Sequence, residues 1–321
     1  MRALVHDADT PGGLRLAEVA EPVPRESQVL VEVHATSLNL GELAYLAERR
    51  WPGEIPGWDA AGVVVRAAAD GSGPAPGTRV TTFGWQGGWA EYRAAETADL
   101  AVVPDAVDLR AASTLPVAAV TALQALRRLG PVLGRRVLIT GASGGVGRFA
   151  VRLAAHAGAE VVAAVGDPSR GENLSRLGAA QIVTALEDIG DPVFGVLDNV
   201  GGAMLAGAFG LLEPGGTALS IGQASGQATT IDFENERLRG GGRRLEPFVV
   251  STPFGADLTY LVGLLAKGSL DPQIGWHGPR HRAAEAAEAL LSRRVLGKAV
   301  LDVPHTGSDR SPLPPTPTIS G

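Results

Sequence analysis

The hydrophobic pattern of the first 110 residues has the period of β-strands. Short apolar or alternating runs, among them ALVH, LRLAEV and VLVEVHATSL, are separated by turns rich in Gly and Pro. Residues 39–49 interrupt this pattern and could form a helix. The first third of the chain is therefore predicted to be rich in β-structure.

The pattern changes in the middle of the chain, where helical and strand-like periods alternate. LPVAAVTALQALRRLG and residues 145–157 have helical spacing, whereas RVLITG and AEVVAAVG are typical of buried strands. PSRGENLSRLGA is predicted to be one helix that ends at its last glycine. Strands that alternate with helices at this spacing indicate a parallel sheet covered on both faces. Three more strands are expected at AQIVTA, VFGVLDNVG and TALSIG.

The remainder of the chain predicts helix, short strand, helix and strand, followed by a tail. The helices are expected in residues 254–272 and 279–296, and the strands at QIGWH and AVLDV. Residues 304–321 are rich in Pro, Ser and Thr and cannot bury much apolar area, so they are predicted to be disordered.

Length and charge limit the function classes. A chain of 321 residues is long enough for two domains with separate cores. The formal charge of −6 offers no basic face, which argues against nucleic acid as the main partner. The longest apolar run, residues 149–165, is broken by charged residues, and the first ten residues lack the apolar core of a signal peptide. We expect a cytoplasmic protein without a membrane partner.

The chain contains no cysteine, which excludes a disulfide framework, a Cys-ligated zinc, a thiolate nucleophile and an iron–sulfur cluster. Its six histidines form no HExxH pair. His277 and His281 are four residues apart, but the Gly-Pro-Arg between them makes a shared helical face doubtful. A surface role is expected for both, and no metal site is predicted.

A glycine-rich run between a strand and a helix is the strongest local signal. Ala142-Ser-Gly-Gly-Val-Gly147 follows RVLITG, and it supplies the second and third glycines of a dinucleotide-binding fingerprint with Ala in place of the first. The helix N-terminus that follows presents free N–H groups to a pyrophosphate. A purely structural turn is the alternative. The predicted contacts are Ser143, Gly144, Gly145, Val146 and Gly147.

The end of the next strand bears on the choice of cofactor. An acidic residue there holds the ribose hydroxyls of NAD, whereas a 2′-phosphate needs donors and positive charge. The strand ends at Val165-Gly166 without an acid, and Asp167, Ser169 and Arg170 follow. We interpret Arg170, with Ser169, as the contact for a 2′-phosphate, which favours NADPH. Asp167 is the contrary signal; its alternative role is a helix N-cap before a proline.

The order of eight motifs extends this interpretation over residues 1–303. They are VLVEVHATSLNLGE, PGWDAAGVV, GWAEY, LPVAAVTALQAL, VLITGASGGVG, LDNVGG, EPGGTALSIG and GKAVL. With these motifs the chain resembles the medium-chain dehydrogenase/reductase superfamily, in particular its zinc-independent quinone oxidoreductase branch. The resemblance implies an α/β fold with a GroES-like, β-rich catalytic domain (1–113 and 253–303) and a Rossmann domain with a doubly wound parallel sheet (114–252).

The chain departs from the zinc-dependent members of that superfamily. Those members hold a catalytic zinc through a Cys shortly after the VHATS-like strand and through a His in a GHE motif. The corresponding stretches here are Ser37-Leu-Asn39 and Gly57-Trp58-Asp59. We therefore expect zinc-independent chemistry.

The resemblance also implies positions for the site residues. Asn39 is expected near the nicotinamide, Phe248 in the substrate pocket and Lys298 reaching the cofactor from the last strand. For Thr121 and Asn199, capping of a helix or turn is the alternative. The further cofactor contacts implied are Thr121, Asn199, Gly201, Ile221, Gly222 and Val249.

Hydride transfer to an enone or quinone places negative charge on a carbonyl oxygen, which needs hydrogen-bond donors in the absence of a metal. The candidates are Asn39 and Tyr45, and Tyr45 or solvent would also supply a proton. Trp58 is expected to line the pocket. Asp59 is expected to hold the backbone of the PGWD turn, and Glu42 has no assigned role.

The sequence thus predicts an NADPH-dependent, zinc-independent reductase of an activated C=C bond (an enone or enoyl thioester) or of a quinone. Two alternatives remain open. One is an NADPH-binding sensor or structural protein without turnover, and the other is a divergent enzyme that catalyses a non-redox step such as cyclisation or isomerisation. A homodimer is expected through the sheet edge near Val249.

Overall fold

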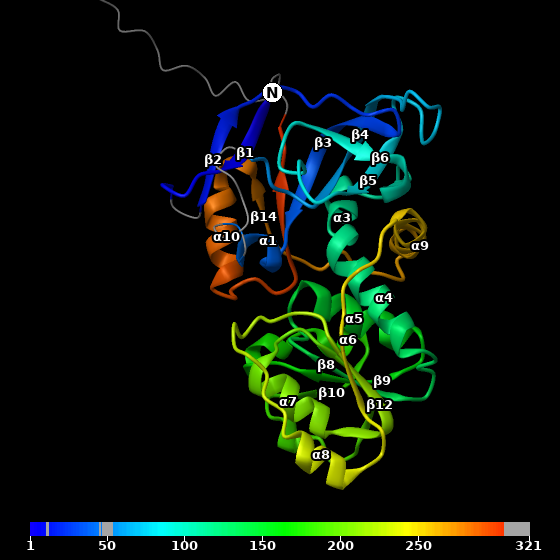
Figure 1. Ribbon diagram of the computed structural model, residues 1–321. Coiled ribbons are helices and arrows are strands. Elements are labelled where there is room, and N and C mark those ends of the chain that lie inside the picture. Colours follow the sequence, from blue (N-terminus) through cyan, green and yellow to red (C-terminus); the bar gives the residue numbers. More distant parts are fainter. Residues whose placement is uncertain (11–12, 45, 47–53, 305–321) are drawn as a thin grey trace, which may run out of the picture.

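The computed structural model describes residues 1–10, 13–44, 46 and 54–304. The chain forms two lobes, each built on a large sheet (Figure 1). The predicted proton donor Tyr45 and the tail from residue 305 lie outside the described residues. Among the described residues, no helix is long and apolar enough to cross a bilayer.

The first lobe is the GroES-like part, and its seven-stranded sheet joins the two ends of the chain. The strand order is β14-β15-β3-β4-β5-β7, and β6 also pairs with β3. Because β15 pairs antiparallel with β3, the last strand completes a sheet whose first strand in the chain begins at Gln28. A two-stranded ribbon of β1 (Arg2–His6) and β2 (Leu14–Glu18) lies beside it. The other strands are β3 (Gln28–Leu38), β4 (Asp59–Arg66), β5 (Arg79–Phe83), β6 (Tyr92–Glu96), β7 (Leu100–Val102), β14 (Ile274–Pro279) and β15 (Lys298–Asp302).

The second lobe confirms the predicted doubly wound parallel sheet. Its six strands have the order β10-β9-β8-β11-β12-β13, and every pair is parallel. Counted from β8, this is the 3-2-1-4-5-6 order of dinucleotide-binding folds, in which the ligand crosses the carboxyl ends of the first and fourth strands. The strands are β8 (Arg136–Thr140), β9 (Glu160–Ala164), β10 (Ala179–Val183), β11 (Val193–Asp198), β12 (Leu212–Ser220) and β13 (Arg244–Pro247).

Helices cover both faces of this sheet and connect the lobes. Phe149 on α5 and Leu126 on α4 pack against one face, whereas Leu205 and Phe209 on α7 pack against the other. After β13 the chain returns to the first lobe, where α9 packs against β7 and lies beside α4 (Figure 1). The helices are α1 (Leu40–Ala44), α3 (Leu109–Ser113), α4 (Val120–Leu129), α5 (Gly145–His156), α6 (Leu174–Leu177), α7 (Gly202–Gly210), α8 (Phe233–Arg239), α9 (Gly255–Ala266) and α10 (Ala283–Leu291).

The prediction of one continuous helix at PSRGENLSRLGA is wrong. The segment forms a 3-10 turn, η4 (Pro168–Gly171), and then the short helix α6. Asn173 separates the two with a φ of 65°, in the left-handed region that cannot continue a right-handed helix. Local backbone geometry overrides the apolar spacing here.

Candidate active site

The glycine loop lies between β8 and α5, as the fingerprint predicts. Gly147 must lack a side chain, because a Cβ there would be 2.4 Å from the carbonyl oxygen of Gly141. Gly144 is the N-cap of α5 and carries no capping side chain, so the first amides of this twelve-residue helix are available to an anion. The C-terminal segment closes on this loop, where the Gly297 amide donates to the Ser143 carbonyl at 3.0 Å.

Arg170, which follows β9, and Arg293, which follows α10, lie together beside the same loop. Arg170 donates from Nε to Ser143 Oγ at 3.0 Å and from Nη1 to the carbonyl of Arg293. Arg293 in turn donates to the carbonyl of Ala224 beyond β12. Burial and then the neighbouring Arg293 lower the pKa of Arg170. Among the described residues neither guanidinium pairs with a carboxylate, so both keep their positive charge for an anion.

Asp167 has the alternative role that the sequence left open. Its carboxylate accepts from the Ser169 amide at 2.9 Å and caps η4 ahead of Pro168. The Ser169 hydroxyl also donates to Asp167, at 2.5 Å. The acid at this strand end is therefore engaged by the turn itself.

The carboxyl ends of β8, β11 and β12 are tied together beside the loop. Asn199 donates from Nδ2 to the Thr140 carbonyl at 2.9 Å, which is the capping role considered for it. Asp198 is fully buried, accepts from Thr140 Oγ1 at 2.5 Å and from the Gly201 amide at 2.8 Å, and has a pKa raised by burial. The Ile221 and Gly222 amides both donate to the Asp198 carbonyl. These bonds hold the carboxyl ends of the three strands together at the edge of the sheet where dinucleotides bind in this fold.

A buried ionic cluster lies on the first-lobe side of the glycine loop. The Lys298 ammonium donates to the Leu38 carbonyl at 3.0 Å, to Asn39 Oδ1 at 2.5 Å and to Asp59 Oδ2 at 3.1 Å. The Lys298 stem lies against α5, since a Cβ on Gly145 would be 3.1 Å from Lys298 Cδ. Lys298 thus spans from the dinucleotide loop to Asn39, and its expected contact with the cofactor stays a prediction.

Asp59 does not hold the PGWD turn, and that expectation is wrong. Its Oδ1 accepts from the Val117 amide at 3.0 Å, and its Oδ2 accepts from Ser37 Oγ at 2.6 Å and from Asn39 Nδ2 at 2.9 Å. Asp59 is fully buried and begins β4 beside β3, so its carboxylate faces the end of β3 and the Val117 amide and not its own turn.

Glu42 holds that turn instead. Its Oε1 accepts from the Trp58 amide at 2.6 Å, and its Oε2 accepts from the backbone amide of Asn39 at 3.1 Å and from Asn39 Nδ2 at 3.0 Å. Burial, and secondly the charge of Asp59, raise the pKa of Glu42 to about 7. Both hydrogens of the Asn39 amide therefore go to carboxylates, one to Glu42 and one to Asp59.

Arg93 balances the charge of the cluster from β6. Its guanidinium donates to the Trp58 carbonyl at 2.9 Å and to the Gln86 carbonyl at 3.2 Å. Burial lowers the pKa of Arg93 to about 10. Gly84 leaves room for it, because a Cβ there would be 2.2 Å from Nη2. Two buried cations thus face two buried carboxylates around Trp58.

Trp58 belongs to a set of aromatic side chains. Its ring meets that of Trp85 edge to face at 5.6 Å, and Phe83 contacts Trp85 at 5.0 Å and stacks on Phe254 at 4.0 Å. Trp85 is 54% exposed and borders a hollow of about 820 Å³. Trp89, in contrast, is fully buried in the core.

The remaining predicted residues are less closely associated with this cluster. Thr121 is buried in the first turn of α4. Phe248 is partly buried against the core, whereas Val249 is 76% exposed beyond the edge strand β13. The segment after Val249 is fixed to α4, because the Ser251 amide donates to Gln124 Oε1 at 2.8 Å and Gln124 Nε2 donates to the Ser251 carbonyl.

The donor set around Asn39 does not fit a zinc ion. It offers amide, hydroxyl and indole groups and the carboxylates of Glu42 and Asp59, and an ammonium lies 3.1 Å from Asp59. Zinc sites in proteins are built from thiolates, imidazoles and carboxylates, and a cation at this place would be repelled by Lys298. Within the described residues, no group of three or more His, Asp or Glu side chains is placed to hold a metal.

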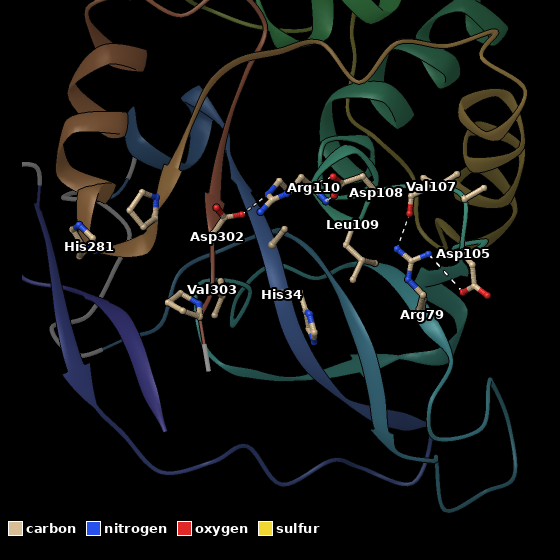
Figure 2. A pocket seen from close by; sticks show the side chains of 14 residues that line it. His34, Arg79, Asp105, Val107, Asp108, Leu109, Arg110, His281, Asp302 and Val303 are labelled. Atoms are coloured by element: carbon tan, nitrogen blue, oxygen red, sulfur yellow. Dashed lines mark hydrogen bonds and ion pairs between the residues drawn. The ribbon is translucent and has the colours of Figure 1, made fainter. Parts of the chain in front are cut away.

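A separate hollow of about 740 Å³ lies on the outer face of the first lobe (Figure 2). Arg79 donates there to the carbonyls of Pro104 and Val107, and Arg110 donates to Asp302 at 2.6 Å. The described residues that line it include none of the predicted site residues. Its charged groups bind one another across the rim.

Three site residues were missed from the sequence, and only one of them has a local signal. Asn39 and Glu42 have the spacing of a capping box, in which the acid three residues after the N-cap accepts from the N-cap amide. Arg93 and Arg293 have no comparable pattern, because their contacts are made by residues distant in sequence.

Comparisons with known proteins agree with the fold. The family models for an alcohol dehydrogenase GroES-like domain and for a zinc-binding dehydrogenase match residues 25–105 and 177–301. The chain is 34% identical over 264 residues to the acrylyl-CoA reductase AcuI of Ruegeria pomeroyi, covering 72% of this chain and 78% of that protein.

Solved structures show the same architecture. The quinone oxidoreductase of Coxiella burnetii has a TM-score of 0.84 and 27% identity over 95% of this chain and 99% of its own. An Escherichia coli quinone oxidoreductase complexed with NADPH has a TM-score of 0.85 over 94% of this chain and 100% of its own, and at 22% identity it shows the fold alone. A GroES-like domain joined to a dinucleotide-binding domain defines the protein as an oxidoreductase. The chain belongs to the medium-chain dehydrogenase/reductase superfamily and is quinone-oxidoreductase-like.

Proposed function

We propose that this protein is an NADPH-dependent, zinc-independent reductase that transfers hydride to an activated C=C bond or a quinone. The observation that carries the proposal is the position of Lys298. Its stem lies on Gly145 at the dinucleotide loop and its ammonium binds Asn39 and Asp59. The polar centre beside the loop is thus occupied by an ammonium that would repel a Lewis-acid metal, which suits an acceptor that is already electron-poor.

The cofactor assignment is supported by charge and backbone geometry. The amides at the start of α5 would hold the pyrophosphate, with Ser143, Gly144, Gly145, Val146 and Gly147 lining it. Arg170 and Arg293 would hold the 2′-phosphate, because they supply two positive charges where β9 ends. NADPH, when bound, supplies the hydride.

The acceptor proposal rests on the residues in and around the buried ionic cluster. The edge-to-face pair of Trp58 and Trp85 offers an apolar wall to a flat acceptor. Tyr45 stays our proposed donor for the carbonyl oxygen or the α-carbon. Asn39 stays proposed beside the nicotinamide, although a direct bond to the acceptor requires it to release Glu42 or Asp59. The names of the relatives give the acceptors to test, an acrylyl thioester and quinones.

The test is oxidation of NADPH by the purified protein with acrylyl-CoA, a free enone and a benzoquinone, against NADH as comparison. Turnover with any of the three acceptors supports the proposal, and the order of kcat/KM among them identifies the class. Tight NADPH binding without oxidation would favour the sensor role. Absence of nucleotide binding would favour a non-redox enzyme.

We also propose a homodimer through the free edge of the six-stranded sheet. β13 is the edge strand, and the exposed Val249 follows it. Phe233 and Leu238 on the nearby α8 are 73% and 78% exposed. Light scattering should give twice the monomer mass, and Leu238→Glu should reduce it; a wild-type monomer would contradict the proposal.

A further inference from the structure

The backbone of Trp58 is clamped by buried charges on both sides. Its amide donates to Glu42 Oε1 at 2.6 Å, and its carbonyl accepts from Arg93 Nη1 at 2.9 Å and from the Gly84 amide at 3.1 Å. Glu42 and Arg93 are each only 2% exposed. Hydrogen bonds to ionised groups in a buried setting are strong and directional, so this peptide has little freedom to rotate.

The same carboxylate also fixes Asn39. Glu42 Oε2 accepts from both the backbone amide and the side-chain amide of Asn39, at 3.1 and 3.0 Å. One oxygen of Glu42 is therefore used for the aromatic wall and the other for the polar group beside the dinucleotide loop. Few other side chains could do this, because three N–H donors converge on it and only an ionised carboxylate accepts from all three.

We infer that Glu42 is a positioning residue of the reductase site, which sets the distance between the Trp58 wall and the Asn39 amide and thereby the place of the acceptor. The inference rests on the proposed function for its kinetic consequence. Its structural content, a carboxylate that holds Trp58, is independent of any reaction.

Because Glu42 accepts all three hydrogen bonds only when it is ionised, the geometry of the site should depend on pH. Glu42 is faced by Asp59 on β4, Lys298 on β15 and Arg93 on β6, and burial together with Asp59 raises the pKa of Glu42 to about 7. Once protonated, Glu42 carries an O–H that points at N–H donors, so at least one of its three hydrogen bonds is lost. The acceptor site should therefore loosen as the pH falls through about 7.

The kinetic test compares Glu42→Gln, which keeps the shape but places an NH₂ against N–H donors, with Glu42→Asp, which keeps the charge. For E42Q we expect kcat/KM of the acceptor to fall about 10-fold or more, the effect of losing a hydrogen bond to a charged group. The Kd for NADPH should stay near the wild-type value, and the fall in kcat/KM below pH 7 should disappear. E42D should recover part of the lost kcat/KM and should keep the fall in kcat/KM at low pH.

The matched control is Glu91→Gln. Glu91 is also buried in the first lobe, but it pairs with Arg2 and Arg280, away from Trp58. E91Q should lose stability and keep the wild-type pH profile of kcat/KM. If E91Q reproduces the E42Q profile, or if E42Q keeps the wild-type kcat/KM and acid limb, the inference fails.

A second readout needs no turnover. The chain has five tryptophans, so selective ¹⁵N-tryptophan labelling gives a small set of backbone amide signals, and Trp58→Phe assigns the one that matters. This signal should shift with pH around 7 in the wild type and E91Q and should lose that shift in E42Q. A shift in the expected variants without any reductase activity would support the positioning role and count against the proposed function. A Trp58 signal that is insensitive to pH and to E42Q overturns the inference, whatever the enzyme reduces.

Discussion

The Lys298 ammonium lies 2.5 Å from the side-chain oxygen of Asn39, although 259 residues separate them in the chain. The contact joins the last strand, β15, to the end of β3, and the Lys298 stem crosses Gly145 on its way. One side chain therefore sets the relation between the dinucleotide loop and the polar centre of the first lobe.

Removing this ammonium should strongly destabilise the fold. Lys298→Met leaves Asp59 fully buried without its cation, and breaking a buried ion pair costs about 3–5 kcal/mol. Urea unfolding should show this loss. In the double variant K298M/Asp59→Asn the second substitution should cost much less than D59N alone, since the uncompensated carboxylate is gone. Additive losses would contradict the coupling.

Gly145 and Gly144 should respond differently to a methyl group. In Gly145→Ala the new Cβ presses on Lys298 Cδ at 3.1 Å, and overpacking of this kind costs about 1–3 kcal/mol. In Gly144→Ala the nearest atom is the Gly141 carbonyl oxygen at 3.4 Å, an ordinary contact. G144A should therefore keep the melting temperature and lose nucleotide affinity, whereas G145A should lose both. Equal melting temperatures for the two variants would argue against the contact with Lys298.

Arg170→Ala should weaken NADPH much more than NADH. A hydrogen bond to a charged group contributes about 1.5–3 kcal/mol, so the Kd for NADPH should rise about 10- to 100-fold by calorimetry. Arg293→Ala should act in the same direction because its guanidinium lies beside that of Arg170. An equal loss of affinity for both coenzymes would contradict the assignment of Arg170 as the contact for the 2′-phosphate.

Glu42 should give the protein a stability that decreases with pH. Its pKa is raised from 4.5 to about 7 in the folded protein, so between these values the folded state binds more protons than the unfolded state. The free energy of unfolding of the wild type should fall, relative to that of E42Q, as the pH rises from about 4.5 to about 7, and the difference should then level off. Parallel curves for the two proteins would show that Glu42 does not titrate in this range.

Much of the fold could be predicted from local patterns. Strands such as RVLITG alternate with apolar helices along the chain, and this alternation indicates the parallel sheet. The glycine loop after RVLITG indicates where a dinucleotide would cross the sheet. The error at Asn173 arose because one left-handed residue breaks a helix without altering its hydrophobic period.

The candidate site was only partly accessible to the same reasoning. The spacing of Asn39 and Glu42 is local, and the capping box was there to be recognised. The contacts of Lys298 with Asn39 and of Arg93 with Trp58 depend on the tertiary fold, and no period along the chain encodes them. The direction in which Asp59 faces followed from strand pairing and not from its own turn.

The place of β15 between β14 and β3 also determines when the site can exist during synthesis. A nascent chain that has already released β3 and β4 from the ribosome carries Glu42 and Asp59 without Lys298, and the flank of β3 is still open. Those acids acquire the Lys298 ammonium only after the whole nucleotide-binding lobe has been translated. The first lobe is therefore completed only after the second, and a chain that stops before Lys298 leaves the acids without this ammonium and the edge of β3 unpaired.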